Sequence, residues 1–449
     1  MDTSQIATAL NIDEDSARFL VGILMTFPLG YLMSFIPFGV PKHAFASVGG
    51  LYLLRLTMGD QWIHVPIATV VSYALLRISR PRGLERYVVP LFAMAYCSYS
   101  HVQRQFYRTC VDFSCPQMML TIKLYTVAWN LWDGHCIKQK YQMSRATQNS
   151  KSVALADIPP FVEFCGYCLN FSTVLVGPAY EFHYYKNVCD GNYVIPYCNR
   201  FRRLPGRWKP VLFPLATSIF FAIYHATLVG KYSVLNNPNM SAFGYIIAFS
   251  VFKAKFYFIW KYIESANNLW FGGFNGHGWS ISSNVDIVAI ETAPNMSTFT
   301  RQWNEKTSHW LNRYVYQRHG GNQIITYAIA AIWHGFYPGY YLTYATTVMG
   351  TMCERMGRKR LTPKFGHRLW YKVACVLTIH IVGAYGTTPF VLCDFAPSLA
   401  MWSSQYFIGH LLMVCFYVGV YCIFRCHHVG HPEAVANPPK LASAVQIRL

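Results

Sequence analysis

The sequence predicts an all-α protein that crosses a membrane many times, and two observations lead to this prediction. First, hydrophobic residues make up 53% of the 449 residues and charged residues only 13%, whereas soluble proteins carry about 25% charged residues. So few charges could not cover a water-soluble body of this size. Second, long apolar segments recur along the chain, and a bilayer core of about 30 Å needs roughly 20 apolar helical residues.

The apolar segments predict roughly nine to eleven membrane-spanning helices, allowing for split and short re-entrant pieces. Together they form one membrane-embedded domain over residues 1–426, followed by a polar tail over 427–449. Several segments contain Pro or Gly, which membrane helices tolerate where neighbours satisfy the freed backbone groups. The candidate spans, in order, are residues 18–39, 62–76, 88–97, 118–132, 161–179, 211–229, 243–262, 324–349, 371–391 and 406–423.

The net charge of +19 comes from Lys and Arg residues that cluster between the apolar segments. Such clusters mark the cytoplasmic loops of membrane proteins. They also attract anionic lipid head groups or a polyphosphate cofactor, and the two interpretations are compatible. Nucleic-acid binding is disfavoured, because the basic residues lie between apolar spans rather than on a soluble face.

His334 is the first candidate for chemistry. It lies in the apolar run 330–335, and an ionisable side chain inside a spanning segment is a functional hypothesis by default. Burial favours the neutral imidazole, which can act as a general base. Pro338 would break the helical hydrogen bond to residue 334, and Gly335 and Gly339 leave room beside the ring.

A packed histidine, hydrogen-bonded to a neighbouring helix, is the alternative interpretation of His334. We expect that structural role for His225, His380 and His410, whose apolar surroundings have no comparable Gly and Pro residues. No metal site is expected. The cysteines lack a second close pair at zinc-binding spacing and are interpreted as small buried hydrophobic residues.

Asn304 is the second candidate, in the longest polar stretch, residues 272–322. This stretch is either an extramembrane loop or a functional lid. A carboxamide can donate to a developing oxyanion or orient a substrate carbonyl, although a polar Asn near an interface is often unremarkable. The apolar and aromatic residues of Thr307–Tyr316 follow a helical spacing, which predicts an amphipathic helix at the membrane interface.

Two acidic residues, Asp133 and Glu181, lie at the ends of spans. Acidic residues number 19 against 38 basic ones, so we expect each of these two carboxylates to pair with an arginine.

The pattern of these residues resembles the membrane-bound O-acyltransferase family, which is described by an Asn in a polar segment and a His in an apolar one. Trp303-Asn304 and Trp310-Leu311 are followed here by Trp333-His334-Gly335 and Gly339-Tyr340. The pattern WHG-x-x-x-GY resembles that of the lysophospholipid acyltransferase branch. The amino-acid sequences of other segments are similar to those of its plant and fungal lysophosphatidylcholine-type members. Trp132-Asp133 and Gly177-Pro178-x-x-Glu181-Phe182 look like two further motifs of that branch.

The resemblance implies a helical membrane protein built around an internal chamber, located as a multi-pass protein in the endoplasmic reticulum membrane. Acyl-CoA, as co-substrate, would donate a fatty acyl group to the free hydroxyl of a lysophospholipid, with His334 as base and Asn304 assisting. It implies no metal and no permanently bound cofactor; the partners are the two substrates and membrane lipids. The substrate-binding residues implied are Trp303, Trp333, Gly335, Gly339, Tyr340, Trp132, Asp133 and Glu181.

Three alternatives remain at the level of sequence. The same fold could transfer an acyl group to a sterol, a diacylglycerol or a protein serine. A membrane transporter would show duplicated halves with paired broken helices, and no such repeat is visible. A non-catalytic relative is disfavoured, because both His334 and Asn304 are present.

Overall fold

A computed structural model describes residues 3–107, 113–141, 144–197, 208–235 and 240–426, so the predicted polar tail lies outside the described residues. Within these ranges the chain is helical and contains no strand, which confirms the predicted class. The α-helices are α1 Thr3–Leu10, α2 Glu14–Met33, α3 Val40–Met58, α4 His64–Ser79, α5 Glu85–Val102, α6 Ser114–Lys138, α7 Arg145–Asn149, α8 Phe161–Cys168, α9 Phe182–Cys189, α10 Trp208–Tyr232, α11 Ala242–Leu269, α12 Ile287–Glu291, α13 Met296–Gln302, α14 Glu305–Trp310, α15 Gln323–His334, α16 Pro338–Phe365, α17 Leu369–Leu392, α18 Phe395–Ser404 and α19 Ile408–Cys426. Short 3-10 segments are η1 Gly59–Ile63, η2 Arg80–Arg82, η4 Lys151–Val153, η5 Ile195–Tyr197 and η7 Gln317–His319, and π-helical segments are η3 Gln103–Tyr107 and η6 Leu311–Tyr316.

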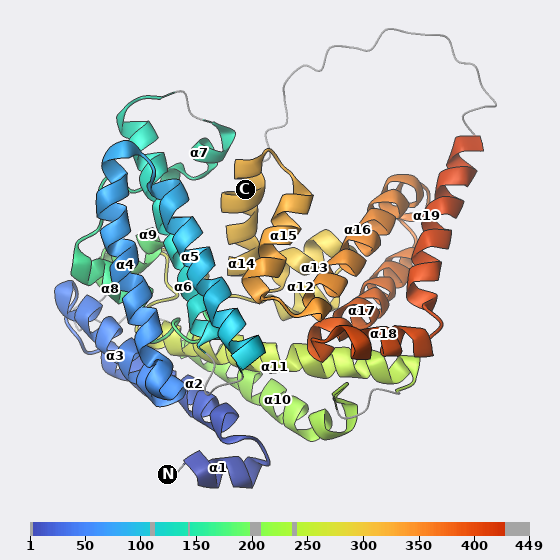
Figure 1. The fold of residues 1–449 in the computed structure, drawn as a ribbon, viewed down its shortest axis with the longest axis horizontal. Helices are drawn as coiled ribbons and strands as arrows, with labels where there is room; N and C mark the ends of the chain where they lie inside the picture. The colour runs from blue at the N-terminus through green and yellow to red at the C-terminus, as the bar shows by residue number, and fades with distance from the viewer. Residues whose placement is uncertain (1–2, 108–112, 142–143, 198–207, 236–239, 427–449) are drawn as a thin grey trace.

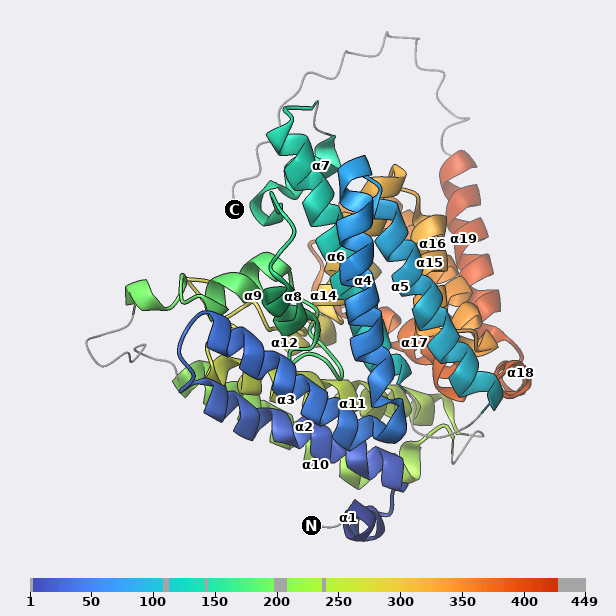
Figure 2. The ribbon, with the colours of Figure 1, turned by 60° about the vertical axis from the view of Figure 1, so that its left-hand side comes forward.

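The long helices form three groups (Figures 1 and 2). Helices α2, α3, α10 and α11 lie in one layer, in which α10 packs on α11, α11 on α2 and α2 on α3. Helices α4, α5 and α6 stand upright on this layer, and α16, α17 and α19 form a second upright group. The short helices α12 to α14, with α15, lie between the two upright groups (Figure 1). The polar stretch 272–322 therefore lies between the two upright groups, with some residues buried, such as Ile290 and Trp310, and others exposed, such as Val288.

Five helical segments are long and apolar enough to cross a membrane, or six if the bent pair α18 and α19 counts as one span. The described residues therefore contain fewer such helices than the roughly nine to eleven expected. The expected span 161–179 forms only the short α8, after which the chain turns. The expected span 118–132 belongs to α6, a helix largely buried inside the protein. Apolar composition alone does not distinguish a lipid-facing helix from a buried one.

Large apolar side chains point outward from the predicted spans, as a membrane protein requires. Phe213 and Phe220 on α10 are 69% and 61% exposed, and Leu412 on α19 is 60% exposed. Contiguous apolar surface of this kind is unfavourable in water and favourable in lipid. With the apolar spans, it shows a multi-pass membrane protein.

Two buried lysines close the C-terminal ends of helices. Lys42 donates from Nζ to the carbonyl of Met33, the last residue of α2, at 2.6 Å. Lys123 donates to the carbonyls of Tyr167 and Cys168 at the end of α8, at 2.9 and 3.1 Å. The last carbonyls of a helix lack partners within it, and a cation there is also favoured by the helix dipole. These two lysines therefore act as caps for buried helix ends.

The predicted helix over Thr307–Tyr316 is present as α14 and the π-helical η6, but its expected position at the membrane surface is wrong. Trp310, Tyr314 and Val315 are 1%, 0% and 0% exposed. They pack in a core with Ile122 on α6 and Trp333 on α15. An apolar helix face looks the same in sequence whether it faces lipid or a protein core, and here it faces the core.

Candidate active site

His334 is the last residue of α15, so the candidate span 324–349 is split into two helices after this residue. The helix ends because Gly335 adopts φ +119° and its N–H donates back to the carbonyls of Ala331 and Ile332. Helix α16 then begins at Pro338. Proline suits the first helical position, where its missing N–H costs no hydrogen bond. His334 therefore sits at the end of a broken helix and not in the middle of a regular one.

Asn304 occupies a left-handed backbone conformation, φ +49°, at the start of α14. Its side-chain oxygen accepts a hydrogen bond from Nδ2 of Asn284 at 3.1 Å. Asn284 also accepts from the backbone N–H groups of Glu305 and Lys306, at 2.8 and 3.0 Å. These three bonds fix the start of α14 and engage the Asn304 oxygen, which leaves the Asn304 amide N–H groups as donors.

The structure places His334 and Asn304 on the wall of one cavity of about 290 Å³. Trp303 and Trp333, two of the predicted substrate-binding residues, line it as well. The rest of the wall is mainly aromatic and aliphatic, with a set of hydroxyl groups: Phe249, Phe252, Phe256, Trp260, Met296, Phe299, Thr300, Thr307, Ser308, Leu311, Thr326, Tyr327, Ala330, Thr343, Tyr344, Thr346, Thr347, Ile379, Val382, Gly383, Gly386, Thr387 and Phe390. An apolar cavity with a few convergent polar groups is the usual form of a ligand site.

Aromatic rings surround the His334 imidazole. Its ring centroid lies 4.7 Å from that of Trp333, 5.1 Å from Phe390 and 5.9 Å from Tyr340. Trp333 is itself fixed, because its indole N–H donates to the carbonyl of Met118 on α6 at 3.0 Å. The imidazole thus stands in a rigid and largely apolar environment, which favours its neutral form.

Gly335 and Gly339, the two glycines near His334, allow neighbouring helices to pack closely against the backbone, and atoms of those helices fill the space beside them. A Cβ on Gly335 would lie 3.0 Å from Nδ1 of His101. A Cβ on Gly339 would lie 2.0 Å from the carbonyl oxygen of Pro389, and the Gly339 N–H donates to the carbonyl of Cys393 at 2.6 Å. The expectation that both leave room beside His334 is therefore wrong. Each allows a neighbouring helix to approach the backbone.

Trp132 and Asp133 lie away from the cavity that holds His334. The Trp132 ring is 3.3 Å from the Arg86 guanidinium carbon. Asp133 is buried and forms a two-pronged ion pair with Arg318, with one contact at 2.9 Å. The predicted arginine partner of Asp133 is confirmed, and the pair ties α6 to the segment that follows η6.

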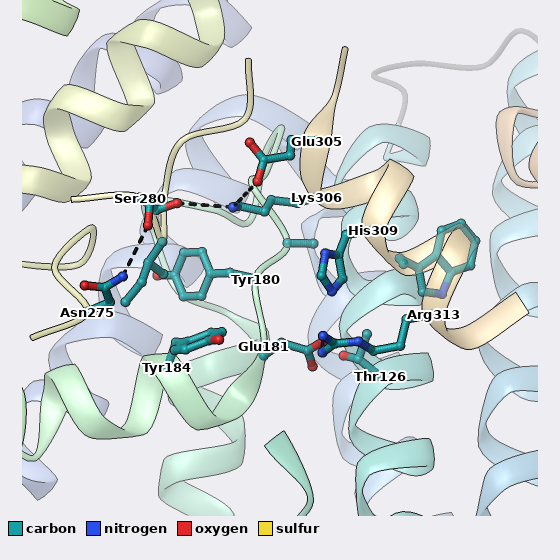
Figure 3. A pocket seen from close by; sticks show the side chains of 13 residues that line it. Thr126, Tyr180, Glu181, Tyr184, Asn275, Ser280, Glu305, Lys306, His309 and Arg313 are labelled. Atoms are coloured by element: carbon teal, nitrogen blue, oxygen red, sulfur yellow. Dashed lines mark hydrogen bonds and ion pairs between the residues drawn. The ribbon is translucent and has the colours of Figure 1, made fainter. Parts of the chain in front are cut away.

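Glu181 lines a second, polar cavity of about 210 Å³ on the other side of α14 (Figure 3). It accepts hydrogen bonds from Asn130, Tyr314 and Arg313 at 2.9, 2.8 and 3.2 Å, so its predicted arginine partner is confirmed too. Lys306 lies across the cavity, paired with Glu305 at 3.0 Å. Alternate faces of α14 therefore meet the two cavities: Thr307 and Ser308 line the apolar one, and Lys306 lines the polar one.

His309 projects into the polar cavity between Lys306 and Arg313 (Figure 3). Burial, and then the positive charges of Arg313 and Lys306, lower the pKa of His309 to about 4. At neutral pH the imidazole is uncharged, so the cationic groups of this cavity are Lys306 and Arg313.

The three other membrane histidines bond to neighbouring groups, as predicted for packed residues. His225 contacts the carbonyl of Val251 at 3.0 Å, His380 that of Glu291 at 3.1 Å, and His410 the Tyr385 hydroxyl at 2.6 Å. None of the three lines either cavity described here.

Sequence reasoning did not single out Asn284, Thr343 or His101. Asn284 had a weak signal, because it opens the Asn-Val-Asp-Ile segment of the long polar stretch. Thr343 lies in an apolar and aromatic segment, whereas His101 lies in a polar one, between Ser100 and Gln103. Only their contacts in the structure reveal them.

Comparison with protein families identifies the chain. Residues 95–393 match the model of the MBOAT, membrane-bound O-acyltransferase, family. The chain belongs to the membrane-bound O-acyltransferase family. The match includes Asn304, His334 and every residue that lines the two cavities. As a member of this family the chain is an O-acyltransferase.

Curated proteins of the family are similar over most of the chain. A Saccharomyces cerevisiae protein named lysophospholipid acyltransferase is 27% identical, over 91% of this chain and 74% of its own length. Lysophospholipid acyltransferase 6 of Drosophila melanogaster is 28% identical, over 83% of this chain and 56% of its own length. Human membrane-bound glycerophospholipid O-acyltransferase 2 is 28% identical, over 83% of this chain and 77% of its own length.

Proposed function

We propose that this membrane-bound O-acyltransferase transfers a fatty acyl group from acyl-CoA to the free hydroxyl of a lysophospholipid. This proposal rests on one observation: His334 and Asn304 line the same apolar cavity. The first can act as a base and the second as a hydrogen-bond donor. The names of the yeast, fly and human relatives support a lysophospholipid as the acceptor. We further propose one membrane domain over residues 1–426, located in the endoplasmic reticulum.

The reaction needs a base and a group that stabilises negative charge. The neutral His334 imidazole takes the proton of the lysophospholipid hydroxyl as its oxygen attacks the thioester carbonyl carbon. The carbonyl oxygen becomes an oxyanion, to which the Asn304 amide donates. The C–S bond then breaks, the sulfur of CoA takes the proton from His334, and the new ester is released. A thioester is already activated, so this scheme uses no metal.

The cavity wall suits the acyl chain, and one of its buried hydroxyls, that of Thr343, has no partner among the described residues. Thr346, Thr347 and Thr351 of α16 each donate to the carbonyl four residues earlier, at 2.9, 2.8 and 2.8 Å. Thr343 is 8% exposed and lines the cavity, yet its hydroxyl has no partner among the described residues. A buried hydroxyl without a partner costs about 1–3 kcal/mol. We infer that Thr343 bonds a polar atom of a substrate, such as a glycerol or thioester oxygen.

The polar cavity across α14 suits the CoA portion of the donor. Its two cations, Lys306 and Arg313, are already paired with Glu305 and Glu181. Its hydroxyl and amide groups therefore suit the uncharged pantetheine arm of CoA rather than the phosphate groups. The two cavities lie on opposite faces of α14, and Asn304 lines the apolar one at the start of this helix. The acyl chain would occupy the apolar cavity, with the thioester near Asn304. One of the basic clusters between the apolar segments lies at residues 200–209, and most of it is outside the described residues.

The deciding experiment compares His334→Ala with His225→Ala in microsomes supplied with a labelled acyl-CoA and a panel of lysophospholipids, sterols and diacylglycerols. His225 is a matched control, because it bonds between α10 and α11 and lines neither cavity. We expect wild type and H225A to acylate one or more lysophospholipids, and H334A to be inactive at equal folded amounts. Transfer only to a sterol or diacylglycerol, or full activity in H334A, would overturn the proposal.

A further inference from the structure

We infer that His101 is a positioning residue that sets the direction of the His334 imidazole, an inference that rests on the proposed function. His101 lies near the C-terminal end of α5 and is 1% exposed. Its Nε2 is 2.9 Å from the carbonyl oxygen of Trp333, the residue directly before His334. The sequence patterns did not single out this residue.

The Trp333 carbonyl needs a partner because α15 ends one residue later. In a continuing helix it would accept from the N–H four residues on, but the chain turns away at Gly335. The N–H of His101 supplies the missing donor, so His101 caps α15 from a different helix. A carbonyl only accepts, so the bond fixes the proton of the neutral His101 ring on Nε2.

The turn at Gly335 is shaped to receive the His101 ring. Gly335 has φ +119°, and its Cα lies against the His101 imidazole. A Cβ on Gly335 would lie only 3.0 Å from Nδ1 of His101. The His101 ring also meets the edge of Phe336, with centroids 6.5 Å apart. His101 therefore contacts residues on both sides of His334 along the chain.

Two bonds from different helices hold Trp333, and through it the backbone of His334. The Trp333 indole N–H reaches Met118 on α6, and the Trp333 carbonyl receives His101 from α5. Cys97, one turn before His101, places its sulfur 3.5 Å from the same Nε2 and packs in the same core as Trp333. Loss of the His101 bond would free the end of α15 to fray, and a base displaced by about 1 Å can lose a factor of 10² in rate.

The test compares two amide variants that differ by one methylene group. In His101→Gln the side-chain N–H groups reach the position of Nε2 and can bond the Trp333 carbonyl, whereas in His101→Asn they fall short. We expect H101N to lower kcat by about tenfold or more with little change in KM, and H101Q to restore kcat to within about threefold of wild type. His43→Asn on α3 is the control, because His43 is equally buried, at 1% exposed, and bonds Tyr185 and Asp190 far along the chain.

Activities are compared per folded protein, measured by size-exclusion chromatography in detergent. If H101N is not recovered folded, His101→Leu takes its place, because leucine fills a similar volume and offers no donor to the Trp333 carbonyl. A kcat well below that of H101Q supports the inference, and a kcat equal to that of H101Q overturns it. Equal kcat values for H101N and H101Q, or a loss in H43N as large as in H101N, would also overturn it. Failure of the proposed function is seen separately, as an absence of lysophospholipid acylation by the wild type.

Discussion

Nδ2 of Asn284 donates a hydrogen bond to the side-chain oxygen of Asn304 at 3.1 Å. This contact decides how the Asn304 carboxamide is oriented, because its oxygen is held by Asn284 and its N–H groups remain as donors. A donor is what an oxyanion requires. The contact therefore orients the Asn304 carboxamide as a hydrogen-bond donor toward the cavity.

We expect Asn304→Asp to be nearly as inactive as Asn304→Ala. Aspartate is similar in size and still accepts from Asn284, but an ionised carboxylate cannot donate and would repel an oxyanion. Removal of one such donor lowers kcat by about 10²–10³-fold. The measurement is kcat with saturating acyl-CoA and lysophospholipid, with Asn312→Asp, a substitution outside both cavity walls, as control. Substantial activity in N304D would show that Asn304 acts as an acceptor or spacer instead.

Thr343→Val should weaken substrate binding without unfolding the protein. Valine keeps the shape and removes the hydroxyl that has no partner in the described residues. Loss of one hydrogen bond to a neutral group corresponds to about a threefold to tenfold effect on kcat/KM. Thr351→Val on the same helix removes a hydroxyl that already bonds the Thr347 carbonyl and lines neither cavity. If the two variants behave alike, Thr343 has no substrate contact.

Val382→Phe should shift the acyl-chain preference toward shorter chains. Val382 lines the apolar cavity from α17, and a larger side chain there competes with the acyl chain for the same volume. Overpacking of this kind costs about 1–3 kcal/mol. Long acyl chains would lose more binding free energy than short ones. The readout is kcat/KM for a series of acyl-CoA lengths. Val373→Phe is the control, since Val373 is 48% exposed on the same helix; a uniform loss across the series would contradict the prediction.

Asp133→Asn should destabilise the protein more than it affects the chemistry. The substitution leaves the Arg318 guanidinium, whose side chain is 4% exposed, without its carboxylate. Removing one partner of a buried ion pair costs about 3–5 kcal/mol. Thermal unfolding in detergent measures the effect. Asp157→Asn serves as the comparison, because Asp157 and its partner Lys138 are both largely exposed and lie 3.9 Å apart. This substitution should leave the unfolding temperature unchanged. An unaltered unfolding temperature in D133N would refute the structural role.

The sequence by itself determined the fold class and the two principal candidates. Low charge content and long apolar segments are sums over many residues, so they predict a helical membrane protein whatever the packing. His334 and Asn304 were visible because an ionisable group in an apolar run, and a carboxamide beside a short helix, stand out from their immediate neighbours. The arginine partners of Asp133 and Glu181 were predictable as a type, because basic residues outnumber acidic ones two to one.

Only the tertiary structure decided which residues meet. His334 and Asn304 share a cavity because α14 and α15 pack between two groups of helices, and no local pattern specifies that contact. The same holds for Arg318 as the partner of Asp133, and for His101 at the Trp333 carbonyl. The sequence predicted a lost helical hydrogen bond at Pro338, but it did not predict that the helix ends at Gly335, because apolar residues continue on both sides of that glycine. Hydropathy averages over such a turn, whereas backbone conformation and packing against α5 fix where the helix ends.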